Sequence, residues 1–224
     1  MKKKVSILRI LLAAVICSSS TLISLSNSLA QVTNETANTI LIENVRIIVG
    51  DGSVIESGHV EFANGEITRV ATGAAAAERR VNKTIINGEG KTLMPALIDA
   101  HSHLGYQGRN SWGSQNYGIE NLIDNLQQYA YYGFSAVFSA GSDAPNIVRA
   151  VENSRRSGEF VGAQLLFAAG MAPPGQGPNN QFLSHALAVE EASGETILYG
   201  LENPEQAQAQ VGIAAGKGIQ FIKI

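Results

Sequence analysis

The chain has 224 residues, of which 16 are Lys or Arg and 19 are Asp or Glu, so its formal net charge is −3. This balance excludes a strongly basic nucleic-acid-binding protein, and a single cysteine excludes a scaffold stabilised by disulfides. The apolar fraction of 45% is ordinary, and the length is sufficient to bury a globular core.

Residues 1–30 have the composition of a secretory signal peptide. Positive charges at Lys2–Lys4 and Arg9 precede an apolar run at 10–16, and the segment ends in the small-residue pattern Ser28-Leu29-Ala30. The apolar run is well short of the roughly 20 residues that a membrane span requires. We therefore expect cleavage after Ala30, export to the periplasm or the medium, and no stable membrane insertion afterwards.

Cleavage would change both the charge and the cysteine content. It removes four of the 16 basic residues and none of the 19 acidic ones, so the net charge moves from −3 to −7. Cys17 is the only cysteine and lies in the removed segment. Because Cys17 follows Ile16, where a lipoprotein signal has a small residue, we do not expect lipidation. Nothing in the remaining charge suggests a nucleic-acid partner.

The next part of the chain predicts a flexible linker over 31–38 and a small β-sandwich domain over 39–95. The linker is polar and has no hydrophobic period. Within the domain, Asn64-Gly65 predicts a tight hairpin, because this pair suits the positive φ angles of a two-residue turn. The segments that we expect to form strands are 39–49, 59–62, 67–70, 83–86 and 91–93.

From residue 96 onward, the pattern changes to alternating strands and helices. We expect strands over 96–103, 134–140, 162–169 and from 219, and helices over 119–130, 145–156 and 203–215. Nearly continuous apolar strands separated by helices predict a parallel sheet. An eight-stranded barrel needs about 250 residues, and 96–224 supplies about half of that. The predicted fold class is therefore α/β, with the first four βα units of a TIM (β/α)8 barrel over 96–224.

Three polar residues end the strand at 96–103. His101 and His103 are two residues apart and therefore share one face of a regular strand, and Asp99 lies on the same face by this alternation. Two neutral imidazoles on one face can bind a divalent metal, whereas burying them without partners would be costly. We expect His101 and His103 to be metal ligands. Asp99 could orient a ligand histidine or cap a neighbouring loop, and both roles stay open.

Lys223 lies in the last apolar strand, between Ile222 and Ile224. Apolar surroundings favour the neutral amine of a lysine, which is unusual for a strand that only builds the core. The alternative is a structural lysine whose amine reaches solvent at the strand end.

These motifs resemble those of the amidohydrolase superfamily, in its imidazolonepropionase and prolidase-like branch, over the N-terminal half of that fold. The matching segments are 93–103, read Leu-Met-Pro-Ala-Leu-Ile-Asp-Ala-His-Ser-His, and 218–224, read Gly-Ile-Gln-Phe-Ile-Lys-Ile. The resemblance implies that His101 and His103 bind the more buried of two metals. It also implies that Lys223 is carboxylated and bridges the metals, since only the neutral amine reacts with carbon dioxide.

In that family, two further histidine ligands and the aspartate that serves the attacking water come from later strands, outside these 224 residues. Zinc suits the donor set best, and manganese and iron remain open. A site with one metal, in which Lys223 stays unmodified, is the alternative to a site with two.

Three residues depart from the family pattern: Ala96, Gln220 and Gln176. Two long loops, at 105–118 and 170–185, leave the carboxyl ends of their strands, where barrel sites are built. Their candidates for substrate contact are Tyr106, Trp112, Tyr117 and Gln176. We expect His185 to lie at the surface and His59 to be structural.

The sequence therefore predicts an exported metal-dependent amidohydrolase that cleaves a C–N bond in a small amide, cyclic amide or dipeptide through metal-activated water. Because His101, His103 and Lys223 provide too few ligands for two metals, and the general base is expected in the C-terminal half of the family fold, we expect the 224-residue chain to be inactive alone. The alternative is a noncatalytic exported binding module with the same fold. Neither the substrate nor the oligomeric state follows from the sequence.

Overall fold

The computed structural model describes residues 39–224, which divide into one compact unit that ends at Met94 and a second over Pro95–Ile224. The expected signal peptide at 1–30, with Cys17, and the expected linker at 31–38 lie outside the described residues. Export and the absence of lipidation therefore stay predictions.

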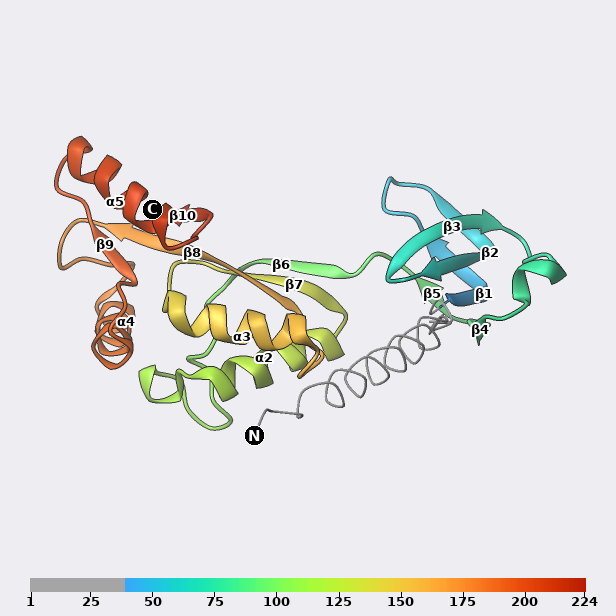
Figure 1. The fold of residues 1–224 in the computed structure, drawn as a ribbon, viewed down its shortest axis with the longest axis horizontal. Helices are drawn as coiled ribbons and strands as arrows, with labels where there is room; N and C mark the ends of the chain where they lie inside the picture. Colours follow the sequence, from blue (N-terminus) through green and yellow to red (C-terminus); the bar gives the residue numbers. More distant parts are fainter. Residues whose placement is uncertain (1–38) are drawn as a thin grey trace, which may run out of the picture. The chain divides into compact units, whose positions relative to one another are not determined.

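The first unit is built on a mixed five-stranded sheet (Figure 1). Its strands are β1 (Thr39–Ile48), β2 (Val54–Ala63), β3 (Glu66–Thr72), β4 (Thr84–Asn87) and β5 (Thr92–Leu93). β2 pairs antiparallel with both β1 and β3, whereas β4 and β5 run parallel to β1. Asn64 and Gly65 turn between β2 and β3 with φ angles of 53° and 82°, as the sequence predicts. β2 begins at Val54, five residues before the expected start.

One face of this sheet is unusually polar. The buried polar residues are His59, Glu43 and Glu61. The 3-10 helix η1 (Ala77–Arg80) provides Arg79, which pairs with Glu61, and Arg80, which pairs with Glu43. Lys83, just after this helix, also pairs with Glu61. The His59 ring contacts the Gly73 carbonyl through Nδ1 at 2.9 Å. The β-sandwich stays a prediction, because the described strands of this unit form a single sheet.

The second unit contains a parallel sheet. Its strands are β6 (Leu97–Ser102), β7 (Phe134–Ser139), β8 (Gln164–Ala172), β9 (Leu198–Gly200) and β10 (Phe221–Lys223). The order is β10-β8-β7-β6, and β9 also pairs with β8. Every pair is parallel, which confirms the α/β class and the parallel sheet. The partial barrel stays a prediction.

The helices of the second unit follow the sequence signals for helix ends. They are α2 (Ile119–Tyr131), α3 (Pro145–Ser157), α4 (Asn180–Ser193) and α5 (Pro204–Gly216), with the short 3-10 helix η2 (Ser114–Asn116) before α2. Gly158 follows the last residue of α3 as its C-terminal cap. The Asn203 side chain caps α5 by accepting a hydrogen bond from the Gln206 backbone N–H. Within residues 39–224, none of the helices combines the length and apolar character that crossing a membrane requires.

α2 and α3 lie beside each other on one side of β7 and β8 (Figure 1). Their apolar faces pack against the sheet because leucine and valine recur there at helical spacing. The shared core comprises Leu122, Leu126, Val137, Val148, Val151 and Leu165. This packing fixes β6, β7 and β8, which lead to the candidate site.

α4 and β9 were not expected from the sequence. We predicted a loop after residue 170 and no strand between 170 and 219, whereas β8 continues to Ala172 and α4 and β9 follow. The proline- and glycine-rich segment 173–178 is typical of a loop, so the helix and the strand that follow it were not predicted. A signal existed, since Asn179 caps α4 by accepting from the Phe182 amide, and Gly194 ends the helix at a φ of 69°.

Candidate metal centre

The two candidate histidines meet at the carboxyl end of β6. The centroids of the His101 and His103 rings are 5.4 Å apart, with an angle of 72° between the ring planes. The register between β6 and β7 shifts between Asp99, which pairs with Val137, and Ser102, which pairs with Ser139. β6 therefore contains a bulge between Asp99 and Ser102, a stretch that includes His101.

The carboxylate of Asp99 contacts α2 and the main chain of β6. It accepts hydrogen bonds from the Tyr129 hydroxyl of α2 at 2.8 Å and from the His101 backbone N–H at 3.0 Å. Regular alternation does not continue through a bulge, so the shared face of Asp99 and the two histidines stays a prediction. Asp99 contacts the His101 main chain, so its described contacts match the capping role rather than the orientation of a ring.

The His103 ring is held on two sides. Its Nδ1 lies 3.2 Å from the Ser142 hydroxyl oxygen, and the ring packs edge-on against Phe182 with centroids 5.1 Å apart. Burial, followed by repulsion from His101 and Lys223, lowers the pKa of His103 below its usual value. At neutral pH the ring is therefore neutral, which is the form that binds a metal.

Lys223 ends β10, where it pairs with Gly170 of β8. Gly141, which follows β7, lies directly beside it, since a Cβ at residue 141 would stand 3.1 Å from the Lys223 Cβ. The charge of Lys223 also acts on the pKa of His103. The structure therefore brings His101, His103 and Lys223 to the same rim, at the carboxyl ends of parallel strands.

The donor set at this rim fits part of a metal site. Within residues 39–224, no three His, Cys, Asp or Glu side chains gather as a group that could hold an ion. Two imidazoles, at least one of them favoured in the neutral form, suit a divalent cation such as zinc, and Lys223 could add oxygen donors only as a carbamate. The described residues supply an incomplete set of ligands.

A hollow of about 300 Å³ lies beside Lys223. Pro173, Pro178 and Leu198 line it together with Phe182, which also contacts the His103 ring. Lys223 is the only charged side chain in the lining. An apolar group of a ligand therefore fits beside the candidate metal residues.

The aromatic residues of the loop at 105–118 form a packed cluster rather than a free surface. Tyr106 is fully buried and stacks on Trp112, with centroids 5.5 Å apart. Trp112 packs edge-on against His185, whose Nδ1 accepts from the Ser114 backbone N–H at 3.0 Å. His185 is partly exposed, and its ring packs against this loop from α4. Gln176 lines a separate hollow with Leu183 and Leu187.

Sequence reasoning missed two buried residues behind His103, namely Ser142 and Asp143. Asp143 is 2% exposed, and its carboxylate accepts from the Tyr117 hydroxyl at 3.1 Å. Burial raises the pKa of Asp143 to about 6, although hydrogen bonds from Ser139, Tyr117 and Ser142 oppose that shift. The available signal was Asp143 itself, an acidic residue in the short loop that follows the apolar strand β7.

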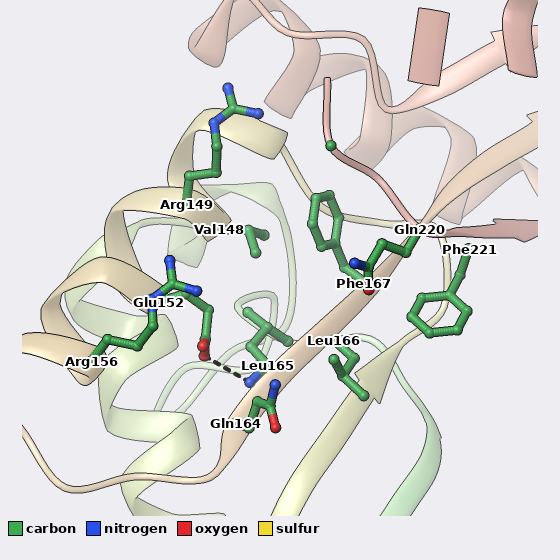
Figure 2. A pocket seen from close by; sticks show the side chains of 11 residues that line it. Val148, Arg149, Glu152, Arg156, Gln164, Leu165, Leu166, Phe167, Gln220 and Phe221 are labelled. Carbon is green, nitrogen blue, oxygen red and sulfur yellow. Dashed lines mark hydrogen bonds between the residues drawn. The ribbon is translucent and has the colours of Figure 1, made fainter. Parts of the chain in front are cut away.

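Figure 2 shows a different hollow, of about 310 Å³, between α3 and β8. The Glu152 side chain of α3 points to β8 there, and its carboxylate accepts from the Leu165 N–H at 2.8 Å. None of the candidate metal residues lines this hollow.

The amino-acid sequence is similar to parts of several known proteins. No model of a protein family matches the chain. An imidazolonepropionase of Stenotrophomonas maltophilia is 39% identical over 184 residues, which cover 78% of this chain and 37% of that protein. A 5-methylthioadenosine/S-adenosylhomocysteine deaminase of Halalkalibacterium halodurans is 37% identical over 67 residues, or 29% of this chain and 15% of the deaminase.

The fold is also similar to solved structures. The crystal structure of A. niger ochratoxinase matches with a TM-score of 0.62 at 15% identity, over 83% of this chain and 46% of the ochratoxinase chain. The chain spans less than half the length of each of these three proteins.

Proposed function

Because the chain belongs to the amidohydrolase superfamily, we propose that it is part of a metal-dependent hydrolase that cleaves a carbon–nitrogen bond with activated water. The observation that supports this most directly is the convergence of His101, His103 and Lys223 at one rim of the parallel sheet. Barrel enzymes assemble their sites at this end of the strands.

In this proposal, His101 and His103 hold a divalent cation, preferably zinc, through ring nitrogens. When bound, the cation supplies Lewis-acid activation of the scissile carbonyl and of water. Lys223 is carboxylated: its neutral amine forms an N–C bond to carbon dioxide and loses a proton, which leaves a carbamate with two donor oxygens. A site with one ion and an unmodified Lys223 is the competing form, and metal content near two or near one per chain separates them.

The substrate in this proposal is a small neutral amide, cyclic amide or dipeptide with an apolar group. The hollow beside Lys223 supports this choice, because Pro173, Pro178, Phe182 and Leu198 offer contact area and no charge. A charged group placed there would lose hydration without gaining a partner from these side chains.

The larger architecture and the location belong to the same proposal. β6, β7, β8 and β10 would be the first four strands of a TIM-type barrel, preceded by a β-sandwich that includes β1–β5. Later strands would supply the remaining ligands and the general base, so the 224-residue chain alone would not turn over substrate. The signal-like segment at 1–30 supports export.

The decisive experiment tests the full-length protein with a panel of dipeptides and cyclic amides, and with zinc or a chelator. We expect hydrolysis that the chelator abolishes and that zinc restores. His101→Ala and His103→Ala should each lower bound zinc and reduce kcat/KM at least 100-fold, as expected for lost ligands.

His185→Ala is the matched control, because His185 lies in the aromatic cluster and should leave zinc content unchanged. Full zinc content in a His101→Ala/His103→Ala double variant would refute the metal site. Tight binding of panel compounds without any turnover would favour the noncatalytic binding module.

A further inference from the structure

A chain of buried polar groups contacts His103 from the loop that follows β7. The Ser142 hydroxyl oxygen lies 3.2 Å from His103 Nδ1 and 3.4 Å from an oxygen of the Asp143 carboxylate. Ser142 is fully buried and Asp143 is 2% exposed. We propose that Ser142 and Asp143 are positioning residues that fix the tautomer and the orientation of His103 for metal binding, an inference that rests on the proposed function.

The direction of the hydrogen bonds follows from the chemistry of the groups. The Ser142 hydroxyl lies 3.3 Å from the Ser139 hydroxyl and 3.4 Å from Asp143. In this proposal it donates its single proton to Asp143, because an ionised carboxylate only accepts, whereas Ser139 can itself donate to Ser142. The serine oxygen is then an acceptor for a proton on His103 Nδ1. This arrangement selects the tautomer that carries its proton on Nδ1, which leaves the Nε2 lone pair free for a metal.

The Asp143 carboxylate is itself held in place. The Tyr117 hydroxyl donates to its other oxygen at 3.1 Å and accepts from the Ala144 N–H at 2.9 Å. The Tyr106 hydroxyl donates to the Ser142 carbonyl oxygen at 2.9 Å. The two tyrosines predicted as substrate contacts therefore support the serine–aspartate pair from the loop after β6.

The composition of this network points to function rather than to stability alone. A buried carboxylate is costly, and the hydrogen-bond partners of Asp143 within residues 39–224 are hydroxyl groups instead of a lysine or arginine. A carboxylate that acts on a metal-binding histidine repays that cost, because it orients the ring and raises its basicity. Loss of such a group typically weakens metal binding 10- to 100-fold.

The test measures zinc affinity of the full chain by competition with a chelating dye, with zinc alone as the probe. Ser142→Ala and Asp143→Asn should each weaken zinc binding 10- to 100-fold. Tyr117→Phe keeps the aromatic ring and removes one donor to Asp143, so it should produce a smaller loss in the same direction. Ser135→Ala is the matched serine control, since Ser135 is exposed on β7 and should leave zinc affinity unchanged.

A second readout is the tautomer of His103 in the wild-type chain. The chain has four histidines, so the ring nitrogens of His103 can be assigned in a 15N spectrum by comparison with His103→Gln. The metal-free wild-type chain should show His103 with its proton on Nδ1, and Ser142→Ala should convert it to a mixture of tautomers. A wild-type ring with its proton on Nε2 would overturn the proposal.

The outcomes separate this inference from the proposed function. If His103→Ala abolishes zinc binding while folded Ser142→Ala and Asp143→Asn bind zinc within twofold of wild type, only the positioning role is refuted. If His101→Ala and His103→Ala leave zinc affinity intact, the metal site itself is refuted.

Discussion

At residue 141, the backbone and the neighbouring side chains both require glycine. Gly141 has a φ of 80°, which is unfavourable for other residues. An added Cβ would stand 3.0 Å from the Gly170 Cα and 3.1 Å from the Lys223 Cβ. Residue 141 therefore affects both the local turn and the position of Lys223.

We expect Gly141→Ala to destabilise the protein more than Gly158→Ala. Gly158 has the same φ of 80° with nothing within 4 Å of the added Cβ, so it isolates the backbone cost of about 1–2 kcal/mol. Gly141→Ala should add about 1–3 kcal/mol from crowding. Urea unfolding of the two variants measures this difference, and equal losses of unfolding free energy would contradict it.

The candidate ligands could be predicted from the sequence, but the residues that support them could not. The His101 and His103 pair is visible because strand spacing alone brings the rings together. Ser142 meets His103 across 39 positions, so its role depends on the pairing of β6 with β7. The bulge between Asp99 and Ser102 could not be predicted either, because no residue of β6 marks it.

At the scale of elements, Glu152 joins α3 to β8. It is 7% exposed, and its carboxylate accepts from the Leu165 N–H at 2.8 Å (Figure 2). The carboxylate also accepts from the Arg155 guanidinium. The carboxylate therefore satisfies a backbone donor of β8 from the helix side.

Glu152→Ala should lower the free energy of unfolding by about 2–3 kcal/mol, because it leaves a buried N–H without its partner. Glu191→Ala on α4 is the control, since Glu191 is exposed and should change stability by less than about 0.5 kcal/mol. Denaturant titration of both variants tests this, and a loss at Glu152 no larger than at Glu191 would show that water satisfies Leu165.

Helices and turns whose ends are marked by particular residues could be predicted from the sequence, whereas elements without such residues could not. α3 and α5 begin at prolines and the hairpin turns at Asn64-Gly65, so local chemistry located them. α4 follows a proline- and glycine-rich segment that suggested a loop, and β9 has only three residues. Short strands of this kind are defined by their partner, here β8, rather than by their own sequence.

At the scale of the whole molecule, β10 presents apolar surface. Phe221, Ile222 and Ile224 are 41%, 43% and 94% exposed, and among the described strands β10 pairs only with β8. An exposed apolar strand edge is a template for pairing with another chain.

We therefore expect the 224-residue chain to self-associate as its concentration rises. Ile222→Lys should shift the association to at least about tenfold higher concentration, since a charged residue disfavours edge pairing. Val161→Lys is the control, because Val161 is 84% exposed in the turn before β8, away from this edge. Sedimentation velocity of the three proteins measures the effect, and a monomer at every concentration would contradict it.

Gly170 aligns with two strands at once, because β8 pairs it with Lys223 of β10 and with Leu198 of β9. A Cβ there would stand 2.8 Å from both the Gly141 carbonyl oxygen and a Leu198 methyl carbon. Directed evolution of new substrate preference in this scaffold should therefore find almost no tolerated replacement at residue 170. Productive libraries would instead vary Leu198 and Pro173, which line the hollow beside Lys223. Substitutions there would change the shape of the hollow without displacing Lys223.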